Sequence, residues 1–386
     1  GVCGQEMRRT PSFPADREDL CFERGTSLDE LIDSAKRRAF ELTPLQVGQP
    51  GCVDELSHLV VQGGITNTLL KVFKTNDPAK ACLARIFGPK TEEIIDREQE
   101  RRCVDYLASH GIGKHIYVRL QNGQLEEWLE GRTFEPPSEM MSPDIARKIA
   151  HRVAALHSLP IPPFMMHTDG RKGDRNGPVS GSTLWPQLWK WLQQCRDAVS
   201  RVHAGDADYA KSAKILIFDL NAIEKEMHRI EAQTSSFRSP VVVGHNDLLC
   251  GNVFLFEDGS VDFIDFEYCA ATERGFDIAN HFNECVGFDC DWENYPSKEQ
   301  QIDFIREYLS VVRYQTNNNS EGCAASTSDS DVESVWEETQ AYINASHLFW
   351  GLWAIIQTVH SPIDFDFFSY AFRRLSAIWL PQFRLP

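Results

Sequence analysis

Two stretches of sequence decide the fold, HNDLLCGN at residues 245–252 and IDFEY at residues 264–268. The residues between them, VFLFEDGSVDF, read as two short apolar strands joined by an AspGly turn, which predicts a β-hairpin. Asp247, Asn252 and Asp265 follow one another at spacings of five and thirteen positions. The pattern indicates that a polar loop and the segment after a hairpin bring these oxygen-bearing side chains together.

These relative spacings are the ones that kinase catalytic machinery uses. Phosphoryl transfer needs an acceptor beside the attacking hydroxyl group and oxygen ligands for Mg²⁺ on the phosphates. We predict that Asp247 is the catalytic base, and that Asn252 and Asp265 take part in catalysis as the metal ligands, with ATP and Mg²⁺ required. The alternative, in which these side chains only complete a turn and end a strand, is disfavoured because motif, spacing and hairpin context agree.

Working outward, the chain is β-rich before Gly131 and mainly helical after it. Ser27 and Glu30 form the pattern of a capping box before a helix. Five β-rich runs follow between residues 56 and 129, with a charged helix at 91–110 and a hairpin signal at Asn122 and Gly123. Later helices are expected at 143–159, 184–202, 212–235 and 347–359.

The domain organisation follows from this division. We expect a flexible tail at 1–26, an N-terminal ATP-binding lobe at 27–130 and a C-terminal catalytic lobe at 131–386. Two polar insertions, at 168–182 and 316–334, have the composition of mobile surface loops.

Composition limits the classes of function. The formal net charge of −17 argues against nucleic acid or an anionic membrane as the main partner. The eleven cysteines contain no CxxC pair and no spacing typical of a zinc site, which favours reduced thiols and a cytoplasmic protein. The N-terminus lacks the apolar core of a signal peptide. The most apolar stretch, 347–359, is shorter than the roughly 18 residues that suggest a membrane span, so we expect a buried helix.

From 63 to 383 the sequence resembles the choline/ethanolamine kinase family, which shares the bilobal fold of protein kinases and aminoglycoside phosphotransferases. The landmarks, besides the two stretches quoted above, are GGITN at 63–67, ARIFG at 84–88, RGFDIANHFNE at 274–284 and ASHLFWGLWAIIQ at 345–357. The resemblance implies an α+β, protein-kinase-like fold with a small β-rich N-terminal lobe, a large helical C-terminal lobe and ATP in the cleft between them. It also implies a candidate homodimer, because members of the family often form dimers.

Residues that bind ATP are implied by position. A turn over the phosphates would be formed by Gly63, Gly64, Ile65, Thr66 and Asn67. Arg85 takes the place of the phosphate-binding lysine of protein kinases, and Glu98 would position it. The backbone near Glu127 and Leu129 would meet the adenine. An ordinary hairpin turn, a solvated glutamate and a simple edge strand would look the same in the sequence.

Two further residues are expected to support the 245–252 loop. His245 precedes the base by two positions and would brace the loop through hydrogen bonds. Asp277 matches the family aspartate that supports the loop from below, so we expect it to act through the loop and not on the substrate.

The resemblance also implies a pocket for an amino alcohol. Besides Asp247, its residues would be Glu267, Tyr268, Glu284, Trp350, Trp353, Phe365 and Tyr370. Carboxylates and aromatic faces both attract an ammonium group. Without the family context, two tryptophans three positions apart on an apolar helix are more often part of a core.

Ethanolamine is the expected substrate, with phosphoethanolamine as the product and the first step of the CDP-ethanolamine route to phosphatidylethanolamine as the role. Ethanolamine keeps three N–H donors and needs acceptors, whereas choline gains from a complete aromatic cage. Choline kinases usually have aromatic residues where this chain has Cys285, Val286 and Gly287. A choline kinase, or one acting on both, stays open because the other aromatic positions are present.

Three other classes are disfavoured. A non-catalytic pseudokinase scaffold would not need the base and both metal ligands, which are retained. A protein kinase would carry DFG where this chain has DFE, followed by an APE segment. An antibiotic kinase of the aminoglycoside type is disfavoured by the FWGLW helix.

Overall fold

The computed structural model describes residues 16–17, 19–23, 27–43, 52–61, 67–88, 97–167, 181–317, 327–361, 363 and 365–380. The chain divides into two compact units. We call them the sheet unit, Gly1–Ile95 with Gly113–Glu130, and the helical unit, Asp96–Ile112 with Gly131–Pro386. This division confirms the predicted α+β class. The sheet unit ends at Glu130, where the sequence placed the lobe boundary, whereas the helix at 97–109 lies in the helical unit.

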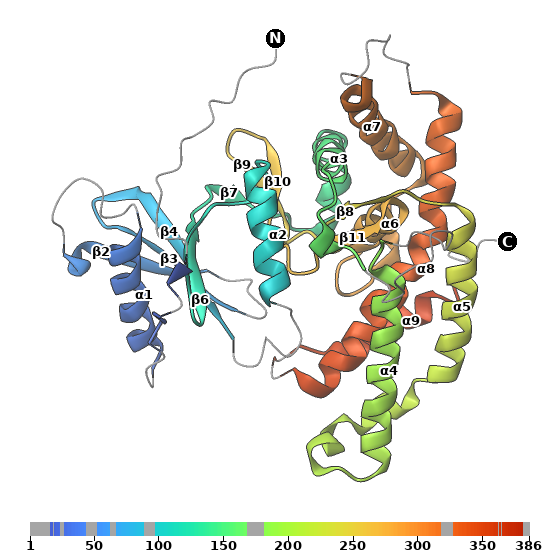
Figure 1. Cartoon of the computed structure of the whole chain (residues 1–386), viewed down its shortest axis with the longest axis horizontal. Helices are drawn as coiled ribbons and strands as arrows, with labels where there is room; N and C mark the ends of the chain where they lie inside the picture. The colour runs from blue at the N-terminus through green and yellow to red at the C-terminus, as the bar shows by residue number, and fades with distance from the viewer. Residues whose placement is uncertain are drawn as a thin grey trace. The chain divides into compact units, whose positions relative to one another are not determined.

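The sheet unit is built on a six-stranded sheet with the order β1-β5-β6-β4-β3-β2. Figure 1 labels β2, β3, β4 and β6 of this sheet. Its strands are β1 (Asp16–Arg17), β2 (Leu56–Val61), β3 (Asn67–Lys74), β4 (Asp77–Phe87), β5 (Ile116–Leu120) and β6 (Gly123–Glu127), and a 3-10 turn, η2 (Val53–Glu55), precedes β2. All five predicted β-rich runs are strands. The turn between β3 and β4 consists of Thr75 and Asn76, and Pro78 lies in β4 beside a register shift, where a missing N–H is tolerated.

Helix α1 (Leu28–Leu42) confirms the predicted capping box. Glu30 N donates to Ser27 Oγ over 3.3 Å, and Ser27 N donates to Glu30 Oε2 over 3.2 Å. The buried side chains of Ile32, Ala35 and Ala39 join the core that covers the sheet.

The prediction of a flexible tail at 1–26 is wrong for residues 19–23, which the structure describes. Phe22 is only 1% exposed and belongs to the core of the sheet unit. Its N–H donates to Asn122 Oδ1 and its carbonyl accepts from Asn122 Nδ2, both over 2.8 Å. This amide side chain, together with contacts from Gln121 N to Leu20 O and from Glu23 N to Ser34 Oγ, holds the backbone of a segment whose local sequence carries no helix or strand signal.

The hairpin between β5 and β6 turns one residue earlier than its AsnGly signal suggests. Leu120 pairs with Gly123, so the turn consists of Gln121 and Asn122. Gly123 lies within the strand, where a Cβ atom would come 2.3 Å from the carbonyl oxygen of Arg85. The glycine is thus required by the close approach of β4 and not by a left-handed turn.

The helical unit contains the described α-helices other than α1 (Figure 1). They are α2 (Arg97–Ser109), α3 (Pro143–His157), α4 (Leu184–His203), α5 (Leu220–Ser236), α6 (Arg274–Glu284), α7 (Lys298–Asn317), α8 (Asp329–His360) and α9 (Phe367–Ala377). Shorter 3-10 segments are η4 (Pro137–Met141), η5 (Pro163–Met165), η6 (Ala207–Ile217) and η7 (Trp292–Asn294). Gly111, with φ of +71°, lies just beyond the end of α2, where a left-handed glycine commonly terminates a helix.

Two small sheets flank the segments 245–252 and 264–268. Strands β8 (Val241–Gly244) and β11 (Ala270–Glu273) pair antiparallel. Strands β9 (Val253–Phe256) and β10 (Val261–Phe263) form the predicted hairpin, and β7 (Gly131–Arg132) pairs with β9. The 245–252 loop therefore joins the end of β8 to the start of the hairpin.

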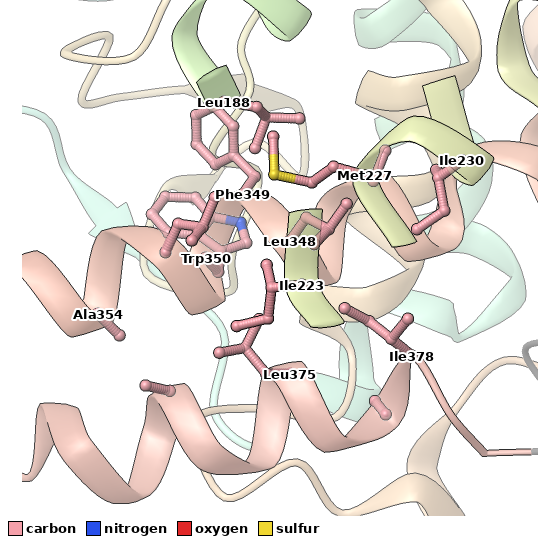
Figure 2. Packing of buried hydrophobic residues seen from close by; sticks show 14 of the residues in the cluster. Leu188, Ile223, Met227, Ile230, Leu348, Phe349, Trp350, Ala354, Leu375 and Ile378 are labelled. Carbon is pink, nitrogen blue, oxygen red and sulfur yellow. The ribbon is translucent and has the colours of Figure 1, made fainter. Parts of the chain in front are cut away.

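Two hydrophobic clusters fill the helical unit. One gathers apolar faces of α4, α5, α6, α8 and α9. Figure 2 shows Leu348 and Trp350 of α8 in this cluster together with Ile223 and Met227 of α5. The other joins α2, α3 and α7 to the strands and to α6. Helices α6 and α8 contribute to both clusters, so they link the two halves of the core.

The helix expected at 212–235 is interrupted. Residues up to Ile217 form the 3-10 segment η6, and α5 begins only at Leu220. Asp219 is the reason for the restart, because its Oδ1 accepts from Asn221 N and Ala222 N, both over 3.0 Å. An N-cap aspartate ends one helical segment and starts the next.

The apolar stretch at 347–359 is part of the much longer helix α8, and most of it is buried. Among the described helices, none has the length and hydrophobicity needed to cross a bilayer. The insertion expected at 316–334 contributes the first turns of α8, where Ser328 and Asp331 form a capping box. Residues 168–180 and 318–326 lie outside the described part of the chain.

Replacing Phe22 by alanine tests the correction to the tail. Because Phe22 is fully packed, we expect Phe22→Ala to lower the free energy of unfolding by about 3–5 kcal/mol. Urea denaturation measures this change. Phe372→Ala is the control, since Phe372 is 52% exposed and its loss should change stability by about 0.5 kcal/mol or less. Equal effects of the two variants would contradict the packing of residue 22.

Candidate active site

The 245–252 loop is held by one buried carboxylate. Asp277 of α6 is 0% exposed, and it accepts from His245 N over 3.0 Å and from Asn246 N over 2.6 Å. His157 Nε2 lies 2.9 Å from Asp277 Oδ2, and His157 Nδ1 lies 3.1 Å from the Tyr308 hydroxyl. Burial alone would raise the pKa of Asp277, but the hydrogen bond and charge of His157, together with His245, hold it below its usual value.

Local geometry explains why the loop meets α6. Strand β11 runs directly into α6 and pairs antiparallel with β8, so the helix starts beside the first residue of β8, where Arg274 N donates to Pro240 O over 2.9 Å. The first turn of the helix then brings Asp277 to the backbone N–H groups that follow the end of β8. Gly244 ends β8, and a Cβ atom there would come 2.2 Å from Thr272 Cγ2. Asn246 then adopts the left-handed region with φ of 65°, and its side chain donates to Tyr268 O over 2.9 Å. These constraints turn the chain toward Asp247.

Asp247 and Asn252 are in direct contact. Asn252 Nδ2 donates to Asp247 O over 2.9 Å and to Asp247 Oδ2 over 2.8 Å. Asp247 is 6% exposed, and its Oδ1 has no hydrogen-bond partner among the described residues. Because buried polar atoms are normally paired, this oxygen is suited to accept a proton or a hydrogen bond from a ligand.

Asp265 is tied to the same loop through its neighbour. Ile264 N donates to Asn252 O over 2.9 Å, and His245 Nε2 lies 3.1 Å from Ile264 O. Burial lowers the pKa of His245 below its usual value, although the negative charge of Asp277 raises it in part. A neutral imidazole fits the contacts, because Nε2–H donates to Ile264 while Nδ1 accepts from Asp247 N over 3.3 Å. Asp265 itself has φ of 66°, a conformation unusual for a residue with a side chain.

Negative charge accumulates around Asp247. Burial raises the pKa of Asp247 well above its usual value, and the nearby carboxylates of Glu284, Glu267 and Asp265 raise it further. The hydrogen bond from Asn252 acts in the opposite direction. A cluster of like charges in a buried setting is relieved when a cation binds. The site is therefore suited to a metal ion, an ammonium group, or both.

The donor set fits Mg²⁺. Because Asn252 Nδ2 faces two oxygens of Asp247, its Oδ1 is turned away from Asp247 and can act as a ligand. Asp265 supplies a carboxylate within the same network. The described residues contain no group of three or more His, Cys, Asp or Glu that could hold a metal by themselves. Mg²⁺ commonly takes only one or two protein carboxylates and completes its shell with phosphates and water.

The carboxylate of Glu284 has a partner that the sequence analysis missed. Arg374 of α9 is 0% exposed, and its Nη1 donates to Glu284 Oε1 over 2.8 Å and to the Tyr370 hydroxyl over 3.2 Å. The signal was available, because Arg374 continues the buried stripe of α9 formed by Phe367, Tyr370 and Ala371 at helical spacing. A charged residue on such a stripe indicates a buried ion pair.

The predicted aromatic residues make a series of ring contacts. Tyr268 lies 5.3 Å from Trp350, Trp350 lies 5.4 Å from Trp353, and Phe365 lies 6.1 Å from Tyr370 between ring centroids. Phe288, which the sequence analysis missed, lies 5.4 Å from Phe365 and 5.6 Å from Tyr370. It directly follows the non-aromatic residues that separated this chain from choline kinases.

Trp350 is mainly a core residue. It is 4% exposed, and its indole N–H donates to Asn280 Oδ1 over 2.7 Å. Trp353 is half-buried and contacts Phe367 at 5.5 Å between ring centroids. Of the two tryptophans, Trp353 is therefore the better placed to face a ligand.

The predicted phosphate-binding arginine lies in the sheet unit. Arg85 is on β4, and its Nε lies 2.9 Å from Glu126 Oε1 on β6. Glu126 is 0% exposed, accepts from Gln124 Nε2 over 2.6 Å and pairs with Lys114. Burial alone would raise the pKa of Glu126, but Arg85 and Lys114 lower it below its usual value. The sequence analysis missed Glu126, because strand pairing, not local pattern, brings it to Arg85.

The remaining residues implied for ATP binding are placed as follows. Glu98 is on α2 in the helical unit, with its side chain 69% exposed and 3.7 Å from Arg102 Nε. Glu127 ends β6, where its N–H donates to His115 O over 2.8 Å, and Leu129 follows the strand. Asn67 begins β3. Gly63, Gly64, Ile65 and Thr66 lie outside the described residues.

Comparisons with known proteins identify the family. The family model described as choline/ethanolamine kinase matches residues 59–379. A probable ethanolamine kinase of Arabidopsis thaliana is 38% identical over 317 residues, which cover 81% of this chain and 76% of the relative. Ethanolamine kinase 2 of Mus musculus is 32% identical over 358 residues, which cover 92% of this chain and 83% of the relative.

A solved structure agrees with these sequence relatives. An ethanolamine kinase of Plasmodium vivax superposes with a TM-score of 0.76 and 30% sequence identity, covering 95% of this chain and 92% of that one. This match confirms the predicted fold class. The chain therefore belongs to the choline/ethanolamine kinase family.

Proposed function

We propose that this protein is an ATP-dependent ethanolamine kinase. The hydroxyl oxygen of ethanolamine attacks the γ-phosphorus of ATP, the bond from that phosphorus to the β,γ-bridging oxygen breaks, and the products are phosphoethanolamine and ADP. The hydroxyl proton passes to Asp247. The observation that carries the proposal is the buried Asp247, whose Oδ1 has no hydrogen-bond partner among the described residues while Asn252 fixes its other oxygen.

The loop geometry supports Asp247 as the base. Asp277 accepts hydrogen bonds from the backbone N–H groups of the two residues before Asp247. Asn252 donates to Oδ2 of Asp247. A carboxylate held from two sides loses little freedom when it meets a hydroxyl group, and positioning of this kind supplies much of the catalysis in phosphoryl transfer.

Asn252 and Asp265 are proposed as the residues that hold Mg²⁺. When bound, the metal ion neutralises charge on the phosphates of ATP. In the protein itself, the pair of hydrogen bonds from Asn252 Nδ2 directs its Oδ1 away from Asp247, and the left-handed backbone sets the direction of Asp265.

Phosphate binding is proposed for Arg85 in the sheet unit. Its pairing with buried Glu126 fixes the guanidinium, and Lys114 adds a second positive charge beside the same carboxylate. A guanidinium held this way can bind phosphate oxygens in a bidentate fashion. The turn of Gly63 to Asn67 and the backbone at Glu127 and Leu129 remain proposed for the phosphates and adenine. The role of Glu98 in positioning Arg85 remains a proposal as well.

The acceptor residues favour ethanolamine. Three N–H donors on a primary ammonium need acceptors at defined positions, and carboxylates of Glu267 and Glu284 lie close enough to Asp247 to influence its charge. A choline or dual-specificity kinase is the second candidate, because Tyr268, Trp353 and the cluster of Phe288 with Phe365 offer aromatic faces.

The reaction would be the first step of the CDP-ethanolamine route to phosphatidylethanolamine. We place the reaction in the cytoplasm, because it consumes ATP and because the described cysteines are free thiols, as is usual in a reducing compartment. The proposed partner is the small amino alcohol. A homodimer, as is common in the family, is proposed as the assembly.

Asp247→Asn tests the proposed base. The amide keeps the shape of the side chain and can still accept from Asn252, but it cannot take the proton, so we expect turnover to fall by roughly 10²–10⁴-fold. Steady-state kinetics with ethanolamine measures this loss, and isothermal calorimetry measures ATP binding, which should be retained. Asp258→Asn, at an exposed hairpin turn, is the matched control with unchanged turnover. Full turnover in Asp247→Asn would refute the assignment. No ATP consumption by the wild-type protein would favour a pseudokinase.

Glu126→Gln and Glu98→Gln distinguish the two carboxylates proposed to position Arg85. Loss of the buried charge at Glu126 should raise the KM for ATP roughly tenfold, because truncating one partner of a buried charge pair weakens binding. The exposed Glu98 should tolerate the change within about twofold. Kinetics with varied ATP at saturating ethanolamine measures both values. The reverse pattern would favour Glu98 as the residue that positions Arg85.

Direct competition between ethanolamine and choline tests the substrate. We expect kcat/KM to be higher for ethanolamine, because the carboxylates of the site can accept hydrogen bonds from its N–H groups, which choline lacks. Product analysis by mass spectrometry from an equimolar mixture measures the ratio without separate assays. Equal efficiencies would support the dual-specificity candidate, and no turnover of either amine would reject both.

A further inference from the structure

Arg374 is a buried cation that the proposed reaction does not use. It lies on α9, is 0% exposed, and sits in the interior of the helical unit. A buried charge destabilises a fold unless it is paired and hydrogen-bonded. Its partners therefore identify what it does.

The guanidinium of Arg374 links three helices. Nη1 donates to Glu284 Oε1 over 2.8 Å at the end of α6. Nη2 donates to Ser346 Oγ over 2.8 Å and lies 3.3 Å from Ser346 O on α8. Nη1 also lies 3.2 Å from the Tyr370 hydroxyl on α9. The planar fork can satisfy these partners only in one orientation.

Two of these partners are residues of the proposed acceptor site. Glu284 is one of the proposed acceptors for the ammonium group, and Tyr370 contacts both Phe365 and Phe288. Because Arg374 binds Oε1 of Glu284, the direction of the second oxygen, Oε2, is fixed as well. Arg374 thus holds both the carboxylate of Glu284 on α6 and the hydroxyl of Tyr370 on α9 in fixed positions.

We propose that Arg374 is a positioning residue for substrate specificity, acting through Glu284. This inference rests on the proposed ethanolamine kinase function. A primary ammonium donates hydrogen bonds in fixed directions, so it depends on where Glu284 Oε2 points. A quaternary ammonium has no N–H and depends mainly on nearby charge and aromatic surface. Loss of the Arg374 guanidinium should therefore weaken the binding of ethanolamine more than the binding of choline.

The variants Arg374→Lys and Arg374→Met test this role. Lysine keeps the charge but loses the planar fork, and methionine loses both. We expect the KM for ethanolamine to rise roughly tenfold or more, with a smaller change in kcat, and the ethanolamine-to-choline ratio of kcat/KM to fall roughly fivefold or more. The KM for ATP should stay within about twofold. Circular dichroism of each variant verifies its fold.

A double-mutant cycle separates positioning from general destabilisation. In a Glu284→Gln background, Arg374→Met should add little to the KM for ethanolamine, because the group it positions is already altered. The double variant removes both members of the buried pair and so leaves no unpaired buried charge. If Arg374→Met alone does not fold, the double variant can still be compared with Glu284→Gln. Arg306→Met is the matched control, since Arg306 pairs with Asp329 between two helices at an exposed position.

The outcomes distinguish the inference from the function on which it rests. Wild-type protein without ethanolamine turnover overturns both. Wild-type turnover, with a folded Arg374→Lys variant whose KM and ethanolamine-to-choline ratio are unchanged, overturns only the positioning role. Equal losses for the two amines, or additive effects of Glu284→Gln and Arg374→Met on KM, also overturn it. A selective and non-additive loss for ethanolamine supports it.

Discussion

Asp277 accepts two consecutive backbone N–H groups in the interior of the helical unit, and the direction of the 245–252 loop depends on that contact. Beyond the end of strand β8, these two N–H groups have no neighbouring strand to accept their hydrogen bonds. The buried carboxylate of Asp277 accepts them instead. His157 in turn fixes the carboxylate. A loop braced in this way can keep Asn246 in a left-handed conformation and Asp247 in a crowded, negatively charged position, both of which are unfavourable by themselves.

The parts of the fold that the sequence predicted are those encoded by neighbouring residues. The capping box of Ser27 and Glu30, the alternating strands of the sheet and the hairpin after Asn252 each depend on contacts within a few positions. The fold class and the family also followed, because the spacing of Asp247, Asn252 and Asp265 is itself a local pattern. Their individual chemical roles remain proposals.

What could not be predicted depends on distant pairings. Phe22 is ordered by Asn122, a hundred positions away, and no signal in residues 1–26 points to that amide. Glu126 reaches Arg85 only because β4 and β6 are neighbours. Arg374 was visible as a charge on an apolar stripe, but its partners on α6 and α8 required the packing of three helices. Sequence patterns indicate that a side chain is buried more readily than they indicate what it meets.

Helix α8 has a consequence for how this chain can vary. It is 32 residues long, its Glu338 pairs with Arg274 near the start of α6, and a few turns later Ser346 and Trp350 bond to Asn280. Each inserted or deleted residue rotates everything beyond it by about 100° around the helix axis. Between Glu338 and Trp350, the helix can therefore exchange side chains but cannot change length without moving one set of contacts away from α6.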